Sequence, residues 1–148
     1  MSIASEMFSA RWFRIDVYAI LAFLTLQFIL GMVLNLFVTF PSIPPGSPDP
    51  VYFNAIISTP FLLEHFIVGV GLLLGSIWIL LGAAYIKNHR MLAASTFGFL
   101  AILVAYVSGF EFLLSGFQDD VFSFSMSMGF IVALAAYIAL LRLSGGSK

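Results

Sequence analysis

The stretch FLLEHFIVGVGLLLGSIWILLGAAYIKNHRMLAASTFGFLAILVAYVSGFEFLLSGF, residues 61–117, holds two long apolar segments separated only by Lys87-Asn88-His89-Arg90. Each segment is longer than the roughly 20 residues that a helix needs to cross about 30 Å of hydrocarbon. Two helices joined by so short a polar connection must run antiparallel. The stretch therefore predicts a transmembrane helical hairpin.

Two further apolar segments flank this hairpin and complete a set of four expected spans: Val17–Phe40, Phe61–Ile86, Met91–Phe117 and Val121–Leu143. The first is longer than the h-region of a signal peptide and no small-residue cleavage site follows it, so we expect a retained helix. Residues 41–60 contain all six prolines and are expected to form an external loop. The prediction is one all-α domain over residues 1–148, an integral membrane four-helix bundle running up-down-up-down.

The composition requires lipid as the main solvent of the chain. Apolar residues make up 61% and charged residues 9%, whereas a soluble domain carries roughly 25% charge. A net charge of -1 argues against a nucleic-acid partner, because phosphate binding needs clustered Lys and Arg. The absence of cysteine excludes disulfides and thiolate-bound metals.

Charge placement predicts the orientation of the four spans. All cationic residues fall on one side of the arrangement: Arg11, Arg14, Lys87, Arg90, Arg142 and Lys148. Three acidic residues, Asp49, Asp119 and Asp120, fall on the other side. The positive-inside rule makes the cationic side cytoplasmic. We expect a multi-pass protein of the cell membrane with both termini in the cytoplasm.

The second expected span carries two adjacent polar residues on different faces. His65 shares a face with Gly69 and Ser76, whereas Glu64 shares one with a small-residue stripe, Gly71, Gly75 and Gly82. The third span has its own stripe, Gly98, Ala105, Gly109 and Gly116. Because small residues let membrane helices approach closely, we expect the two stripes to pack together and Glu64 to point into that contact.

The first and fourth spans offer polar and thioether groups at corresponding depths. Gln27, Gly31 and Asn35 follow one another at offsets of four in the first span. Such side chains are expected to face the bundle interior. In the fourth span Ser125-x-x-x-Gly129 echoes His65-x-x-x-Gly69, with Met126 and Met128 between. If the second and fourth spans face each other across the bundle, a planar ligand fits between them.

One hypothesis makes His65 an axial ligand of a b-type haem near the outer surface. Imidazole is a standard ligand of haem iron, and the second ligand would be Met128 or Met126. Gly69, one turn away, would leave room for the porphyrin. The alternative is a neutral histidine hydrogen-bonded to a backbone carbonyl or to Glu111.

A second hypothesis makes Glu64, His65 and Glu111 a proton-accepting or cation-binding cluster of a carrier or channel component. Ionisable groups inside a membrane are functional candidates, and burial favours the protonated carboxyl. The alternative is that both glutamates lie at the headgroup boundary and reach water.

Four features give the chain a resemblance to small haem-associated four-helix membrane proteins, the halves of haem A synthase and cytochrome b561-like bundles. They are Gln27-x-x-x-Gly31, His65-x-x-x-Gly69, the cationic turn Lys87–Arg90 and Ser125-x-x-x-Gly129. The resemblance implies a helical bundle that holds haem. In such proteins a second histidine is expected near the start of the fourth helix, where this sequence has Ser125, Met126 and Met128. The Glu-x-x-His-Arg signature of haem A synthase is missing, so haem modification is not expected.

The sequence thus predicts a small subunit of a membrane redox or respiratory assembly that takes part in electron transfer and holds one haem b through His65. Its polar mass is too small for a soluble catalytic domain, so a stand-alone enzyme is not expected. The expected partners are the lipid bilayer and other membrane subunits or further copies of the chain. The alternatives are the carrier that uses Glu64 and Glu111 and a structural membrane subunit without a ligand.

Overall fold

The computed structural model describes residues 10–145, which form an all-α fold. The helices are α2 (Ala10–Phe37), α3 (Asp49–Ser58), α4 (Pro60–Ile86), α5 (His89–Leu114) and α6 (Asp120–Gly145). All except α3 are long and apolar enough to cross a membrane. The predicted membrane bundle of four long helices is therefore confirmed.

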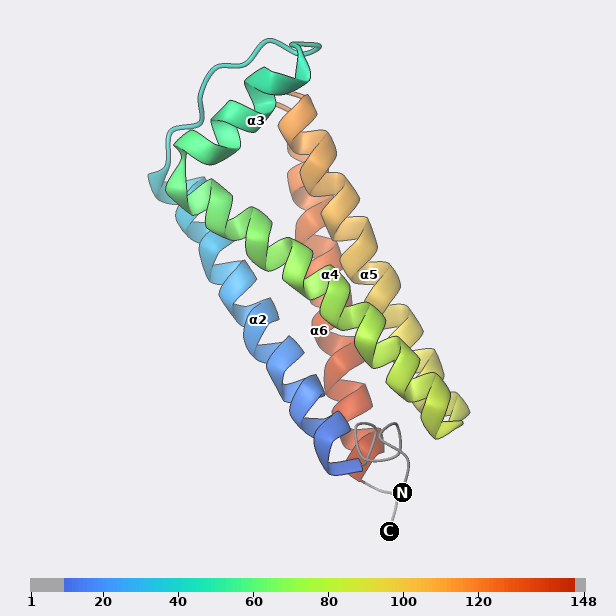
Figure 1. Ribbon diagram of the computed structural model, residues 1–148. Coiled ribbons are helices and arrows are strands. Elements are labelled where there is room, and N and C mark those ends of the chain that lie inside the picture. Colours follow the sequence, from blue (N-terminus) through green and yellow to red (C-terminus); the bar gives the residue numbers. More distant parts are fainter. Residues whose placement is uncertain (1–9, 146–148) are drawn as a thin grey trace.

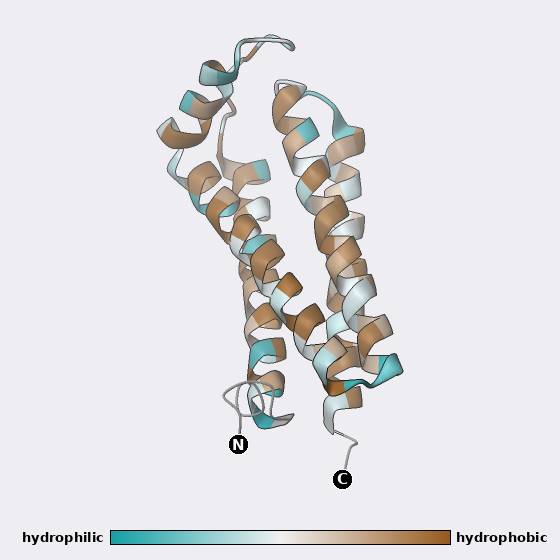
Figure 2. Ribbon diagram, turned by 45° about the vertical axis from the view of Figure 1, so that its right-hand side comes forward, coloured by the Kyte–Doolittle hydropathy of each residue, from teal (hydrophilic) through white to brown (hydrophobic). Residues whose placement is uncertain are grey.

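The four long helices form an antiparallel ring in the order α2, α4, α5, α6, so that α4 and α6 stand at opposite corners. The second and fourth spans therefore face each other diagonally across the bundle, which is the condition set for a planar ligand between them. The α2–α4 and α5–α6 pairs lie together at the end where α2 begins and α6 ends, and they separate towards the other end (Figures 1 and 2). We call residues 38–58 the cap, the end that they cover the cap end, and the opposite end the basic end.

The sharp turn between α4 and α5 confirms the predicted hairpin. Lys87 ends α4 in the left-handed conformation, with a φ of 58°. Asn88 caps α5, because its side-chain oxygen accepts hydrogen bonds from the backbone amides of Arg90 at 3.0 Å and Met91 at 3.3 Å. Because Asn88 satisfies two of the first free amides of α5, the helix begins at the next residue, His89.

Two helices, α2 and α5, differ from the prediction by three residues or more at a boundary, and α2 ends at Phe37 rather than Phe40. The first spanning helix begins at Ala10 rather than Val17, because charged residues outside the hydrocarbon still continue the helix. The third ends at Leu114 rather than Phe117, because Gly116 and Phe117 both have a positive φ, of 70° and 64°. The chain therefore leaves α5 in a turn that packs against the cap.

The cap is not the loop predicted for residues 41–60, because residues 49–58 form the helix α3. Pro50 lies in the first turn of α3, where no backbone amide is needed, and no further proline interrupts the helix. Tyr52 fixes α3 to the bundle by donating a hydrogen bond to the carbonyl of Leu114 at 3.1 Å. A second small core beneath the cap comprises Ile43, Tyr52, Ala55, Ile56 and Leu113.

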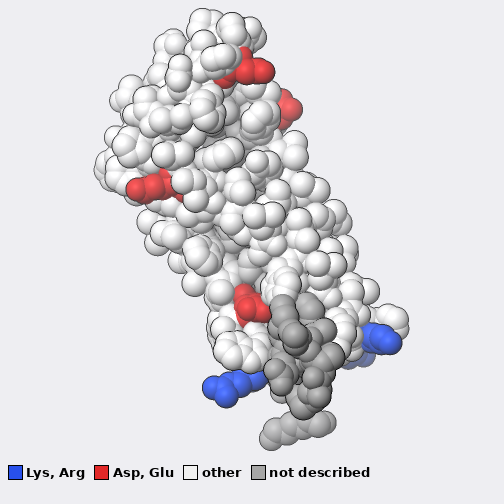
Figure 3. Space-filling model, viewed as in Figure 1, with Lys and Arg blue, Asp and Glu red and all other residues white. Residues whose placement is uncertain are grey.

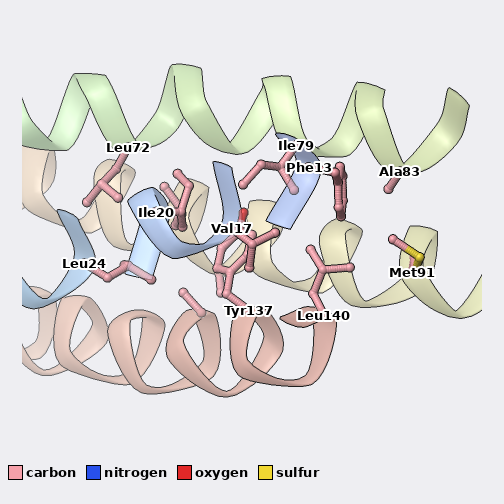
Figure 4. Packing of buried hydrophobic residues seen from close by; sticks show 13 residues of the cluster. Phe13, Val17, Ile20, Leu24, Leu72, Ile79, Ala83, Met91, Tyr137 and Leu140 are labelled. Carbon is pink, nitrogen blue, oxygen red and sulfur yellow. The ribbon is translucent and has the colours of Figure 1, made fainter. Parts of the chain in front are cut away.

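The main core fills the basic half of the bundle. Phe13, Val17, Ile20 and Leu24 follow one another on the inner face of α2 at intervals of three and four residues, and all four are buried. They meet the fully buried Tyr137 from α6 (Figure 4). Large side chains thus fill much of the interior at this end, together with buried serines and alanines.

The glycine stripe of α5 packs against α6 and not against α4, so the predicted pairing of the two stripes is wrong. A Cβ added at Gly98 would lie 2.8 Å from the ring of Tyr137, and one at Gly129 would lie 2.8 Å from the carbonyl oxygen of Ala101. A Cβ at Gly71 of α4 would meet nothing within 4 Å. Small residues therefore allow close approach where a ring or a backbone opposes them.

The ends of the bundle differ in charge. Described basic residues gather at the basic end, Arg11, Arg14, Lys87, Arg90 and Arg142, whereas Asp49, Asp119 and Asp120 lie at the cap end. In the face shown in Figure 3, the basic side chains lie at the lower end of the view, which is the basic end. The helices between the two ends are mostly hydrophobic (Figure 2). Lys148 lies outside the described residues.

Candidate functional site

A pocket of about 270 Å³ lies between the α2–α4 and α5–α6 pairs in the cap half. It is partly open, and all four long helices and the cap contribute to its lining. Its floor consists of the upper residues of the main core, Leu24, Leu72, Ile102 and Ala133. The pocket therefore begins where the large core side chains end.

Aromatic rings form the sides and the top of the pocket. Phe28 of α2 stacks on Phe130 of α6 with 4.9 Å between ring centroids. On the opposite side Phe66 of α4 lies 6.5 Å from Tyr106 of α5, measured between ring centroids. Above them Phe40 of the cap stacks on Phe117 with 4.5 Å between ring centroids. A ligand in this pocket would meet ring faces and edges on several sides.

The polar feature of the pocket is a hydrogen bond between α2 and α4. Gln27 Nε2 lies 3.1 Å from His65 Nε2. A Cβ at Gly31 would lie 3.4 Å from His65 Cε1, and a Cβ at Gly69 would lie 3.3 Å from Gln27 Nε2. Each polar side chain therefore packs on the glycine of the other helix, and the two glycines make the contact possible.

Two atoms of this pair have no hydrogen-bond partner among the described residues. They are Gln27 Oε1 and His65 Nδ1, and both are fully buried. With the Gln27 amide as donor, His65 Nε2 is the acceptor and the ring proton is on Nδ1. An unpaired buried polar group costs about 1–3 kcal/mol. The pair is therefore held in place with part of its hydrogen-bonding capacity unused.

The structure brings together three of the four residues predicted to hold a cofactor. His65, Gly69 and Met126 all line the pocket, from α4 and α6. Met128 does not, and its side chain is 44% exposed on the outside of α6. The two alternatives considered for His65, a bond to a backbone carbonyl or to Glu111, are replaced by the bond to Gln27.

The glutamates of the carrier hypothesis lie elsewhere. Glu64 and Glu111 are exposed near the cap end, and neither lines the pocket. The expectation that Glu64 points into a helix contact is wrong. Among residues 10–145 no group of three or more His, Cys, Asp or Glu side chains could hold a metal ion. A carrier that uses both glutamates stays a prediction.

A b-type haem fits the described residues poorly, although imidazole and thioether are suitable axial ligands. His65 Nε2 is hydrogen-bonded to Gln27, and Nδ1 is buried without access for an iron atom. The propionates of a haem would also need partners, but the lining contains no Lys or Arg. Iron ligation would require the His65–Gln27 bond to open first.

The sequence contained a signal for the His65–Gln27 contact that the prediction did not use. Gln27-x-x-x-Gly31 and His65-x-x-x-Gly69 have the same spacing, and in antiparallel helices the polar residue of each motif falls opposite the glycine of the other. A second contact between α2 and α4 was missed, in which Trp78 Nε1 donates to Asp16 Oδ2 at 3.1 Å. The aromatic walls could not be predicted from the sequence, because phenylalanine occurs along the whole chain.

Comparison of the chain with protein-family models, with curated proteins and with solved structures found no match. The resemblance to haem-associated bundles therefore stays a prediction.

Proposed function

We propose that this chain is a small multi-pass membrane protein that binds one lipid-soluble ligand in the pocket of its cap half. The observation that carries the proposal is the partly open cavity of about 270 Å³, with aromatic walls and the Gln27–His65 pair at one side. Ligand sites are concave, mainly apolar and supplied with a few convergent polar groups. This pocket has each of these properties.

The inner faces of all four helices contribute small or polar residues to the pocket, which supports a ligand rather than a local packing fault. Above the main core these faces carry small or polar residues that line the pocket: Gln27, Gly31, His65, Gly69, Ala105, Gly109, Ser123 and Gly129. Membrane helices associate through van der Waals packing and hydrogen bonds. Space left by four helices at once lowers stability unless another molecule fills it.

The chain would act as a subunit of, or a partner to, a larger membrane assembly. Its described residues outside the four spans amount to the cap and two short turns, which is too little for a soluble catalytic domain. Membership of a redox or respiratory assembly is part of this proposal and depends on the ligand being redox-active.

The proposed orientation places the basic end in the cytoplasm and the cap on the outer side of the cell membrane. The chain has no cysteine, so single-cysteine variants report the orientation without background. We expect an impermeant thiol reagent to label Ser42→Cys, in the cap, on intact cells and His89→Cys only after lysis. Labelling in the reverse order would contradict the orientation.

A pocket-filling variant with a matched control tests ligand binding. Ile102→Phe adds a ring at the pocket floor, whereas Ile131→Phe adds the same ring on the exposed side of α6. Organic extracts of purified wild-type and Ile131→Phe protein should contain one compound at stoichiometric amounts, as measured by mass spectrometry. Ile102→Phe should have lost it. Equal recovery from Ile102→Phe, or no compound from any of the three, would overturn the proposal.

A visible spectrum of the same preparations decides the haem hypothesis. A colourless wild-type protein from haem-replete cells agrees with the geometry of His65. A Soret band that is lost in His65→Ala and retained in His89→Ala would show instead that the His65–Gln27 bond opens and haem is the ligand.

A further inference from the structure

The pocket lining contains no ionised carboxylate, ammonium or guanidinium group. Its polar members are Gln27, Asn35, His65, Tyr106, Ser123 and Ser127. A buried charge without an opposite charge or several hydrogen bonds is strongly unfavourable in a medium of low polarity. The molecule that this pocket accepts is therefore uncharged.

The hydrogen-bonding groups of the pocket have spare hydrogens. If the Gln27 amide donates to His65, both its second hydrogen and the Nδ1 hydrogen of His65 lack an acceptor among the described residues. If the amide is turned over, His65 Nε2 donates to the oxygen and both amide hydrogens are free. Because Gln27 Oε1 and His65 Nδ1 are both fully buried, the N–H that a ligand carbonyl oxygen can accept is the second hydrogen of Gln27 Nε2, with His65 holding the amide in place.

The walls of the pocket suit a flat ring. Phe28 and Phe130 stack on one side at 4.9 Å, and Phe66 and Tyr106 lie on the other at 6.5 Å. Aromatic side chains prefer offset-stacked or edge-to-face contacts with another ring. A planar ring between these pairs would meet aromatic faces and edges of this kind.

The route to the pocket leads from the bilayer rather than from water. The cap covers the end of the bundle, where Ile43 and Tyr52 are buried and Phe40 stacks on Phe117. In contrast Phe28 and Phe110 line the pocket and are about half exposed on the sides of the bundle, at 48% and 49%. A hydrocarbon chain attached to the ligand can therefore pass between the helices into the lipid.

We propose that the ligand is a neutral quinone-type molecule, with a planar carbonyl-bearing ring seated between the aromatic walls, a carbonyl oxygen accepting from the Gln27–His65 pair, and a hydrocarbon chain leaving sideways into the bilayer. This inference rests on the proposed ligand-binding function and names the chemical class of the ligand.

Binding of decylubiquinone to the full chain in lipid nanodiscs tests the inference, with native mass spectrometry counting the bound molecules. We expect one bound molecule for the wild type and at least a fivefold loss of affinity in Gln27→Met and His65→Leu. Gln118→Met and His89→Leu change the same residue types at exposed positions and should bind as the wild type does. Gln27→Met keeps the side-chain length, and a stability loss in mixed micelles no larger than the contribution of one hydrogen bond would show that the variant is folded and that its effect is on binding.

A dimethoxy-methyl-decylbenzene keeps every ring substituent of decylubiquinone and lacks only the two carbonyl groups, so it isolates the hydrogen bond. We expect it to bind at least fivefold more weakly than decylubiquinone. Equal binding of the two, or decylubiquinone binding that Gln27→Met and Ile102→Phe leave unchanged, would overturn the quinone inference. Recovery of a different compound class in the organic extract would also overturn it and leave the ligand-binding function standing. Failure of both extraction and probe binding would remove the two proposals together.

Discussion

The basic half and the cap half of this bundle share the same four helices and a similar apolar composition, yet only one of them is filled. In the basic half Phe13, Val17 and Tyr137 occupy the interior and are fully buried (Figure 4). In the cap half the corresponding positions surround a pocket of about 270 Å³. Overall hydrophobicity therefore brings the helices into the membrane, whereas the size of each inward-facing residue determines whether the interior closes.

The inner face of α2 shows the change within one helix. Phe13, Val17, Ile20 and Leu24 are large and buried, whereas Gln27 and Gly31 follow at the level of the pocket, where Leu30 and Leu34 are the buried large residues. On α4 the same face runs from Ala83 and Ile79 in the basic half to Gly69 and His65 in the cap half. Because both helices change at the same level, the two halves can be altered separately by mutation.

The largest expected effect is the difference in stability loss between a variant of the basic half and a variant of the cap half. Tyr137→Ala removes a fully buried ring from the core and should lower the free energy of unfolding by about 3–5 kcal/mol. Phe66→Ala removes a ring that already borders the pocket and is 37% exposed, and should cost about 1 kcal/mol or less. Unfolding in mixtures of dodecylmaltoside and dodecyl sulfate, followed by circular dichroism, measures both. Equal losses would show that the cap half is packed as tightly as the basic half.

Attachment of the cap gives the next largest effect. Gly116→Ala should lower the free energy of unfolding by about 2–3 kcal/mol, because its φ of 70° disfavours a side chain and a Cβ would collide with the carbonyl oxygen of Ile43. Gly46→Ala is the control, because its φ is 79° but a Cβ there meets nothing within 4 Å. Similar losses in both variants in the same assay would mean that the close contact with Ile43 does not contribute to the cost of Gly116→Ala.

The spans and the hairpin could be predicted from the sequence because each depends on a local property, the length of an apolar run or of a polar turn. The helix partners could not, because helices that are apolar on every side carry a weak facial signal. The stripe of Gly98 and Gly109 was assigned to α4 by proximity in sequence, whereas Tyr137 and Met126 of α6 occupy it. The pocket combines residues of all four helices with the cap, and no single spacing encodes it.

Glycine substitutions on α5 should give smaller, graded effects along the bundle. Gly98→Ala would push a Cβ against the buried ring of Tyr137 at 2.8 Å and should cost about 1–2 kcal/mol. Gly109→Ala would meet the flexible Met126 at 3.1 Å and should cost under about 1 kcal/mol. Unfolding midpoints in mixed micelles compare the two. A larger loss in Gly109→Ala than in Gly98→Ala would contradict the view that the cap half accommodates added atoms more readily than the basic half.

Gly71 on α4 is the reference position for this series, because a Cβ there meets nothing within 4 Å. Gly71→Ala should leave stability unchanged or raise it by up to about 1 kcal/mol through helix propensity. A clear loss in mixed micelles would mean that this face of α4 contacts another molecule in the membrane.

Among the variants expected to lose stability, those of the Gln27–His65 pair should lose the least. Gln27→Met should cost about 1 kcal/mol or less, because the bond to His65 is lost but the unpaired Gln27 Oε1 is removed with it. The double variant Gln27→Met/His65→Leu should lose less than the two single variants together, because the bond between the two side chains is lost in each single variant but only once in the double variant. Additive losses in the same unfolding assay would show that the two side chains do not interact in the membrane.

The attachment of the cap also fixes the order in which the protein can assemble. The cap lies between α2 and α4 in the chain, but the groups that hold it, the carbonyl of Leu114 and the glycine at position 116, belong to the end of α5. A ribosome makes the cap roughly sixty residues before these groups exist. During biogenesis the cap must therefore remain without its anchor until the whole of α5 has been made and inserted, so closure of this end is a late step of folding.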